Sequence, residues 1–212
     1  MKAIFFDTET TGLPLFSEPS EDPRQPHIVQ LAALLVDLDT RKIISSMDVI
    51  VRPNGWTIPA EVAAIHGITT EHASDVGVPE PLALTMFMEL WNNANTRIAH
   101  NEQFDARIVR IALMRYEDPG MADGWKAADA ECTARLATKV CAIPPTTKMT
   151  AAGFTKFKTP NLGEAHQIVC GTPLKDAHTA MADVLGCMAV YFGIKDASIA
   201  TAPAADAHSP NF

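Results

Sequence analysis

Asp7 and Glu9 stand two positions apart, directly after the apolar, aromatic run of residues 3–6. Such a run predicts a buried strand, and Gly12-Leu13-Pro14 predicts that it stops shortly afterwards. Side chains two apart on a strand point to the same face, so the two carboxylates should converge on one point. Carboxylates held this close repel each other unless a cation lies between them or one binds a proton. The pair therefore indicates either a cation site or an acidic strand-to-turn junction without function.

Three later residues are of the types that could complete such a site. Asp105 follows a predicted strand by one helical turn, and open α/β sheets collect ligands at the carboxyl ends of their strands. It can instead stabilise its own helix start through the dipole, by about 0.3–1 kcal/mol. His178 is expected in a loop before a helix whose first turns contain Asp183. An aspartate there could hold a metal ion while the histidine takes a proton from water. The alternative is a surface histidine beside a helix-start acid.

The elements predicted around these residues form one layered sheet. Apolar, β-branched segments at residues 28–36 and 43–51 predict a hairpin that joins the first strand in an antiparallel arrangement. Further strands are expected at residues 97–100 and 130–133, loops at residues 14–26 and 117–124, and helices at residues 60–65, 80–93, 101–115 (with Asn101 as N-cap), 133–141, 161–169 and 179–192. This order implies an α/β fold with a mixed five-stranded sheet flanked by helices.

Length and composition limit the class of protein. With 212 residues, 47% of them hydrophobic, the chain suits one domain, expected over residues 1–194, followed by a disordered tail over residues 195–212. Four cysteines without paired spacing and the lack of a signal peptide favour a cytoplasmic protein. No apolar stretch approaches the ~18 residues of a membrane helix. The net charge of −8 argues against holding polyanions by general electrostatics, so a nucleic acid would need a local site.

One segment offers such a local site. Residues 132–163 contain no acid but several basic residues, including Lys156 and Lys158, and Phe154 and Phe157 interleave with these two lysines. Cations suit the backbone of a single strand and aromatic rings can stack on its bases, so the segment predicts single-stranded nucleic acid binding. A solvated loop is the alternative.

The motifs, taken in order, resemble those of the DnaQ-like 3′-to-5′ exonucleases, in the DEDDh branch typified by the proofreading epsilon subunit of bacterial polymerase III. The resemblance covers residues 2–192 and rests on three motifs and the connecting segment 64–69: Asp7-x-Glu9, His100-Asn101-x-x-Phe104-Asp105 and His178-x-x-x-x-Asp183. The tyrosine branch of the family places Tyr four residues before the last acid, where this chain has Thr179. The sequence therefore resembles the histidine branch.

The resemblance implies a ribonuclease H-like fold and a phosphodiesterase that uses two divalent ions, Mg²⁺ or Mn²⁺. Asp7, Glu9 and Asp183 would hold the ion that activates water, and Asp7 with Asp105 the second ion. His178 would be the general base. Hard oxygen ligands suit these ions, and a pair of ions roughly 3.5–4 Å apart can clamp the attacking and leaving oxygens.

The resemblance also implies the substrate, the 3′ end of single-stranded or frayed DNA, which would be cut to nucleoside 5′-monophosphates. Substrate contacts would come from Thr8, Thr10, Leu13, Glu61 and His66. Departures from the family pattern are the loop at residues 14–26 and Gln30, where many relatives carry Glu.

Three functional alternatives remain open from the sequence. An RNA-trimming enzyme of the same superfamily would use the same acids. A non-catalytic nucleic-acid-binding polymerase subunit should have lost ligands, whereas all four carboxylates and the histidine are present. A proofreading enzyme would have a DNA polymerase as partner, but the segment after Phe192 shows no helical or clamp-binding motif, which favours a free-standing enzyme.

Overall fold

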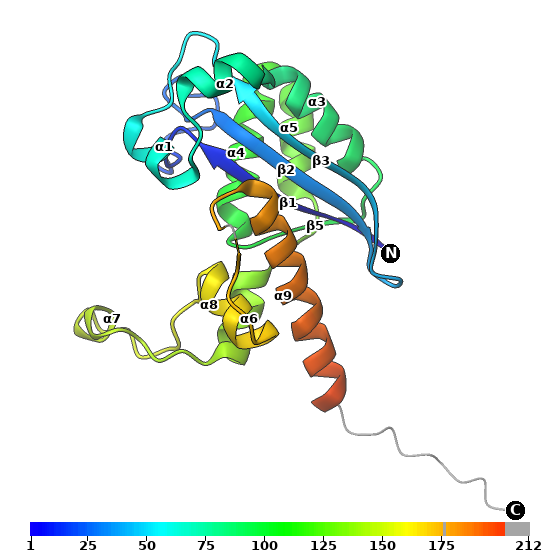
Figure 1. Cartoon of the computed structure of the whole chain (residues 1–212), viewed down its shortest axis with the longest axis vertical. Helices are drawn as coiled ribbons and strands as arrows, with labels where there is room; N and C mark the ends of the chain where they lie inside the picture. The colour runs from blue at the N-terminus through cyan, green and yellow to red at the C-terminus, as the bar shows by residue number, and fades with distance from the viewer. Residues whose placement is uncertain (176, 202–212) are drawn as a thin grey trace, which may run out of the picture.

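The centre of the structure, a computed structural model that describes residues 1–175 and 177–201, is a mixed sheet in the order β4-β3-β2-β1-β5-β6 (Figure 1). Its strands are β1 (Lys2–Thr10), β2 (Ile28–Asp37), β3 (Lys42–Arg52), β4 (Val78–Pro79), β5 (Thr96–Ala99) and β6 (Ala130–Cys132). The first three are antiparallel, and β5 and β6 run parallel to β1. This confirms the predicted α/β fold, with one strand more than the predicted five because β4, of two residues, is too short to leave a sequence signal.

Helices cover both faces of the sheet. They are α1 (Ala60–His66), α2 (Thr70–Val76), α3 (Glu80–Trp91), α4 (Glu102–Tyr116), α5 (Pro119–Ala127), α6 (Thr133–Cys141), α7 (Thr147–Ala151), α8 (Leu162–Cys170) and α9 (Ala180–Thr201). Figure 1 shows α9 crossing one face, with α6 and α8 beside it, and α3, α4 and α5 behind the sheet. Within residues 1–175 and 177–201, no helix combines the length and apolar character that crossing a membrane requires.

Alternation along β1 decides which helix layer each side chain meets. Phe6 packs toward α3 and α5, with its ring 5.5 Å from Phe87 and 5.6 Å from Trp125. Phe5 points the other way and lies 5.5 Å from Tyr191 of α9. Fully burying one such ring stabilises the fold by about 1.5–3 kcal/mol, so the two contacts fix both faces of β1. The odd-numbered residues that follow Phe5 therefore face α9.

Helices α5 and α7 are two that the sequence did not predict. The predicted loop at residues 117–124 is largely α5, because Asp118 caps its start by accepting from the Gly120 N–H at 2.7 Å and Pro119 occupies the first turn. The second is α7, which follows a similar cap at Thr146. In both cases the sequence signal for a helix was a capping residue, Asp118 or Thr146, because neither segment has a clear apolar stripe.

The predicted helix end at Gly193 is wrong, because α9 continues to Thr201. Gly193 serves close packing instead, since a Cβ atom there would lie 2.5 Å from Val169 Cγ1 of α8. Beyond the glycine, Asp196 pairs with Arg41 of the β2–β3 turn. The rest of the predicted tail, residues 202–212, lies outside the described residues.

Candidate active site

Three acidic side chains converge at the carboxyl end of the central strand. Asp7, Glu9 and Asp183 each offer one carboxylate oxygen, and these oxygens all lie within 4.8 Å of one another. The first two come from the face of β1 that α9 covers, and Asp183 comes from the first turn of α9. Packing of Val184 of α9 in the same cluster as Phe5 of β1 holds the helix start above the strand. The structure thus brings together three of the four predicted acids.

Burial makes the negatively charged form of each of these three acids unfavourable. Burial raises the pKa of Asp7 well above its usual value, and the charges of Asp105, Asp183 and Glu9 raise it further. The pKa of Glu9 rises to about 8 for the same reasons, burial first and then Asp183. Burial also raises the pKa of Asp183, against the opposing effect of His178. Each carboxylate therefore favours either a bound proton or a neighbouring cation.

The donor set fits a divalent metal ion. Asp183 Oδ1 is buried and has no hydrogen-bond partner among the described residues. Buried polar atoms in folded proteins are rarely left unpaired, and carboxylate oxygens are the ligands that Mg²⁺ and Mn²⁺ prefer. A cation between the three side chains would supply the missing partner and remove their repulsion. The residues present are thus suited to hold Mg²⁺ or Mn²⁺.

Asp105 lies close to this cluster but stands outside it. Its side chain is 3% exposed and comes from α4, on the other side of the sheet from α9. Thr8 donates to Asp105 Oδ1 twice, from its backbone N–H at 3.0 Å and from Oγ1 at 2.8 Å. Burial raises the pKa of Asp105 to about 7 although these hydrogen bonds lower it. A second ion held by Asp105 stays a prediction, as does contact of Thr8 with substrate.

Asn101 and His100, which precede Asp105, differ in their side-chain contacts from what the sequence indicated. Asn101 adopts the left-handed conformation (φ 66°, ψ 44°), and its side chain makes no capping hydrogen bond within the described chain. Asn101 is thus the N-cap residue of α4, as predicted, but it serves through its backbone, because asparagine tolerates the left-handed turn that starts the helix. His100 contacts Thr133 Oγ1 at 2.9 Å and the Pro160 carbonyl at 3.2 Å, contacts that no sequence signal indicated.

His178 lies directly before α9, as predicted, with an exposed side chain. Its φ of 70° places it in the left-handed region, which few residues other than glycine and asparagine adopt readily. Its backbone hydrogen-bonds the carboxylate of Asp183. The histidine is therefore anchored beside an acid of the cluster while its imidazole remains exposed, and its role as a base stays a prediction.

The predicted substrate-contacting residues differ in exposure. His66, at the end of α1, is buried; its Nδ1 accepts from the Ile68 N–H at 3.1 Å, and burial lowers its pKa. Thr10 is 7% exposed and donates to the Gly12 carbonyl at 2.8 Å. Glu61 is exposed, and Leu13 is 77% exposed. Each of these contacts stays a prediction.

The two predicted basic residues have unequal surroundings. They belong to residues 143–158, here called the α7 arm, whose base is closed by a hydrogen bond from the Lys158 N–H to the Ile143 carbonyl at 2.9 Å. Lys158 pairs with Glu164 of α8, so its charge is compensated. Lys156 is exposed and, with Phe157, lines a cavity of about 680 Å³ beside α6. Binding of single strands by this arm stays a prediction.

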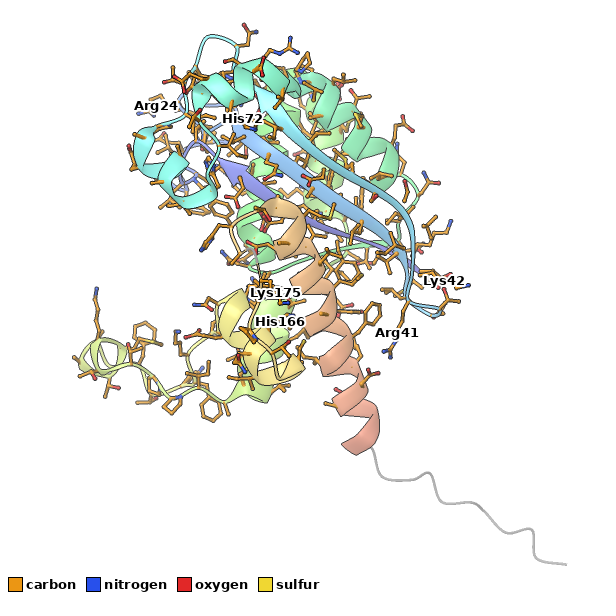
Figure 2. All side chains as sticks on the ribbon, viewed as in Figure 1. Arg24, Arg41, Lys42, His72, His166 and Lys175 are labelled. Carbon is orange, nitrogen blue, oxygen red and sulfur yellow. The ribbon has the colours of Figure 1, made fainter. Side chains whose placement is uncertain are left out.

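Six further basic side chains lie at separate places on the surface. Figure 2 shows Arg24 and His72 near one end of the molecule, Arg41 and Lys42 at the β2–β3 turn, and His166 of α8 with Lys175 near it.

Comparison with solved structures shows the same fold in exonuclease I enzymes. Two complexes of Escherichia coli exonuclease I match, one with single-stranded DNA and zinc and one with a dT13 oligonucleotide, each at 18% identity and TM-score 0.68. They cover 93% and 92% of this chain and 41% of theirs. Exonuclease I of Methylocaldum szegediense matches at 20% identity and TM-score 0.68, covering 92% of this chain and 40% of its own. The chain thus spans about two fifths of these enzymes' length.

Comparison with protein sequences gives the family. No curated protein shows a significant match to this chain. The model of the exonuclease family of ribonuclease T type, however, matches residues 4–191, which include Asp7, Glu9, Asp105, His178 and Asp183. Because that match covers most of the chain, the protein belongs to the exonuclease family, the DnaQ-like group that its motifs resemble.

Proposed function

We propose that this protein is a metal-dependent 3′-to-5′ exonuclease that releases nucleoside 5′-monophosphates from single-stranded or frayed DNA ends. The observation that carries the proposal is the convergence of Asp7, Glu9 and Asp183 within 4.8 Å at the end of the central strand. A cluster of desolvated acids with an unpaired buried oxygen is unfavourable unless a cation is bound. Family membership identifies the reaction class, and this cluster is the place where it would occur.

The chain's own residues supply positioning and proton transfer. Asp7, Glu9 and Asp183 would hold one divalent ion, and Asp7 with Asp105 a second. Such ions, when bound, lower the pKa of water and neutralise charge on the leaving oxygen. His178 would accept the proton of the attacking water, whose oxygen bonds to phosphorus as the bond to the 3′ oxygen breaks. Its exposed ring on a short turn beside Asp183 allows that approach.

Single-stranded DNA is the substrate that the comparisons favour. The two Escherichia coli exonuclease I structures described above are complexes with single-stranded DNA or an oligonucleotide, and this chain shares their fold over more than nine tenths of its length. The buried Thr10 of β1 and His66 of α1, which lie beside each other, would contact the terminal nucleotide. A polymerase partner is not required by this arrangement.

Digestion of a 5′-labelled oligodeoxynucleotide with Mg²⁺ or Mn²⁺ tests the reaction. The wild type should give a ladder that shortens from the 3′ end, and EDTA should abolish it. Asp183→Asn should lower kcat by roughly a thousandfold, because a metal ligand contributes several kcal/mol to transition-state stabilisation. Asp75→Asn, a change at an exposed acid of α2, is the matched control. Full activity of Asp183→Asn in pure protein would refute the proposal.

His178→Asn tests the base separately. Asparagine tolerates the left-handed backbone at this position, so the variant removes the imidazole without straining the turn. A loss of about 10²–10⁴-fold in kcat is expected for a general base. His72→Asn, at an exposed histidine of α2, is the control.

Matched DNA and RNA strands, digested side by side, distinguish the proposed DNA enzyme from an RNA-trimming enzyme, which would degrade the RNA faster.

A further inference from the structure

A basic pocket lies between α4 and α5, in a chain whose net charge is −8. Its volume is about 350 Å³, and four cationic side chains line it: Arg97, Arg107, Arg110 and Lys126. Glu102 is the one acidic residue among the described residues that line the pocket. A pocket that gathers cations in an acidic protein is a feature that the catalytic proposal does not use.

The pocket is separate from the three-acid cluster. At about 100° per residue, Arg107 projects some 200° from Asp105 on α4, and Arg110 some 140°. Asp105 points toward Thr8 of β1, so the two arginines project away from the strand that carries Asp7 and Glu9. A ligand in this pocket would therefore be held by side chains other than the proposed metal ligands.

The single lining acid is already paired. Arg97 Nε donates to Glu102 Oε1 at 2.7 Å, and its guanidinium lies 4.4 Å from the centre of the Trp125 ring. Arg97 also donates to the Trp125 carbonyl. Arg97 and Glu102 thus neutralise each other at the buried floor, which leaves the charges of Arg107, Arg110 and Lys126.

The two α4 arginines are only partly satisfied. Arg107 Nη2 donates to the Glu18 carbonyl at 2.5 Å, and Arg110 Nη1 donates to Ser20 Oγ at 2.8 Å. The Nε atom of each is buried and has no acceptor among the described residues. A buried donor left without an acceptor costs about 1–3 kcal/mol.

Neighbouring charges leave this region positive. Burial lowers the pKa of Arg107, and the nearby charge of Arg110 lowers it further, although the charge of Glu21 raises it. Arg110 also pairs with Asp123 at 2.8 Å, but that carboxylate side chain is 71% exposed, so the pair contributes only about 0–1 kcal/mol. An anion in the pocket would relieve the repulsion, and a small rotation of either guanidinium would give its Nε–H an acceptor.

We propose that this pocket binds a phosphate group, either free or as part of a nucleotide. Guanidinium groups form paired hydrogen bonds with the oxygens of phosphate, and Lys126 adds a mobile charge at the rim. The volume falls at the lower end of the range of about 300–1,000 Å³ found for small-ligand sites. The proposal does not depend on the exonuclease activity proposed above.

Calorimetric titration of the full chain with sodium phosphate, in EDTA and with chloride holding the ionic strength constant, tests the pocket. EDTA keeps the acid cluster free of divalent ions. The wild type should bind phosphate, and Lys126→Gln should weaken that binding by about threefold to tenfold. Lys126 is exposed and far from the core, so its substitution should leave the fold intact. Lys42→Gln, at the exposed β2–β3 turn, is the matched control and should bind like the wild type.

Arg110→Gln should reduce phosphate affinity at least about tenfold, with circular dichroism used to verify its fold. dAMP in place of phosphate identifies the source: tighter binding indicates a nucleotide, and equal binding indicates the phosphate alone. Asp7→Asn should bind phosphate like the wild type even if it has no nuclease activity. Heat of binding that is absent, or that Lys126→Gln and Lys42→Gln change equally, would overturn the proposal.

Discussion

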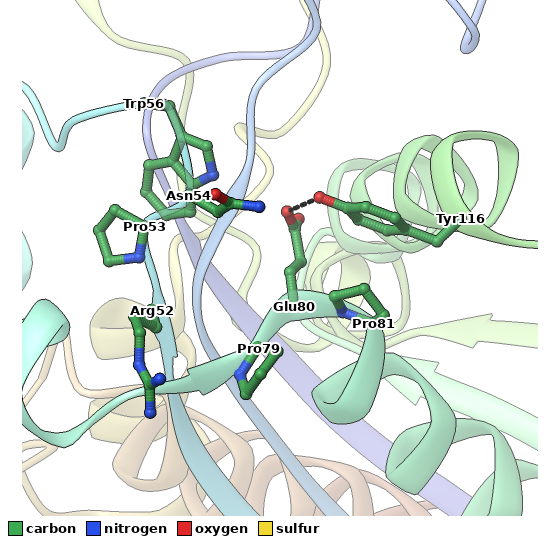
Figure 3. A pocket seen from close by; sticks show the side chains of 8 residues that line it. All are labelled: Arg52, Pro53, Asn54, Trp56, Pro79, Glu80, Pro81 and Tyr116. Atoms are coloured by element: carbon green, nitrogen blue, oxygen red, sulfur yellow. Dashed lines mark hydrogen bonds between the residues drawn. The ribbon is translucent and has the colours of Figure 1, made fainter.

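Two of the regions that shield carboxylates from solvent in this molecule surround them in opposite ways. Glu80, at the start of α3, is 3% exposed. Its Oε1 accepts from the Ile28 N–H at 3.0 Å, and its Oε2 accepts from the Tyr116 hydroxyl at 2.8 Å and contacts His27 Nδ1 at 2.7 Å. Figure 3 shows the Tyr116 contact beside a pocket lined by Trp56 and three prolines. With Arg115 at 3.5 Å as well, this acid is surrounded by donors.

Asp7, Glu9 and Asp183 are surrounded mainly by one another. Their pKa values are raised by burial, and Asp183 Oδ1 lacks a partner among the described residues. A carboxylate that must hold a fold together is paired by donors, as Glu80 is, whereas one left unpaired needs a ligand from outside the chain. The comparison predicts that mutation among the three acids will lower activity without lowering stability, whereas mutation of Glu80 will lower stability with little change in activity.

Asp7→Asn should have the largest effect and separate the two properties. We expect kcat to fall by at least about a thousandfold, or ~4 kcal/mol, because Asp7 is the ligand proposed to contact both ions. The metal-free variant should nevertheless unfold at higher urea than the wild type at pH 8, because a desolvated negative charge is removed. Oligonucleotide digestion and urea denaturation measure the two effects. If Asp7→Asn were less stable than the wild type, the Asp7 carboxylate would have to be stabilised by hydrogen-bond donors, as Glu80 is, and the predicted difference between the two regions would be refuted.

Glu80→Gln should show the reverse pattern. Glutamine keeps one acceptor oxygen but places an NH₂ group where the carboxylate oxygen meets the Tyr116 hydroxyl and His27 Nδ1, and it removes the negative charge near Arg115, so the free energy of unfolding should fall by about 2–4 kcal/mol. Activity per folded molecule should remain within about twofold of the wild type, since the side chain lies away from the acid cluster. Glu89→Gln, at an exposed acid of the same helix, is the control. A large loss of kcat with normal stability would contradict the structural role.

In the metal-free protein, the raised pKa values of the three acids should make the free energy of unfolding depend on pH. Glu9 has an ordinary pKa of 4.5 and a folded-state pKa of about 8, so the folded state binds the proton more tightly. The stability from this group is present below about pH 4.5 and is lost as the pH rises to about 8. Urea denaturation in EDTA should therefore show stability falling over this range, and Glu9→Gln should make the fall shallower. An unchanged slope in Glu9→Gln would assign the effect to other groups.

The parts of this fold that were predictable share a strong local pattern. The buried strand before Asp7, the hairpin of β2 and β3, and the glycine-ended helix α1 follow from apolar periodicity and stop signals. The convergence of Asp7 and Glu9 followed from the two-residue repeat of a strand. Asp183 and His178 were candidates from their residue types, but only the resemblance to a family implied that they belong beside Asp7, because no local pattern says where α9 will dock.

What could not be predicted depends on contacts between distant segments. Gly193 reads as a helix stop, and only the packing of Val169 explains it. Asp105 is held beside the other acids by Thr8, an even-numbered residue of β1 that faces α4, and its charge raises the pKa of Asp7. The basic pocket combines β5, α4 and α5, and its two α4 arginines donate to residues 18 and 20 of the β1–β2 loop; no spacing in the sequence relates these segments.

Gln30 links β3 to the start of α9, and its substitution gives the smallest expected effect. Its Nε2 donates to Asp48 Oδ1 at 2.7 Å, while its Oε1 accepts from the Ala180 N–H at 3.2 Å at the start of α9. Only a neutral amide can do both, because an ionised glutamate would have no proton to donate and would face the carboxylate of Asp48.

We therefore expect Gln30→Glu to lower the free energy of unfolding at pH 8 by about 1–2 kcal/mol and to reduce kcat a few-fold by loosening the helix that carries Asp183. The double variant Gln30→Glu with Asp48→Asn reverses the donor and the acceptor, so it should recover most of both losses. Urea denaturation and oligonucleotide digestion of the two single variants and the double variant measure this coupling. Strictly additive effects would mean that the amide contacts α9 and β3 independently and that its neutrality does not matter.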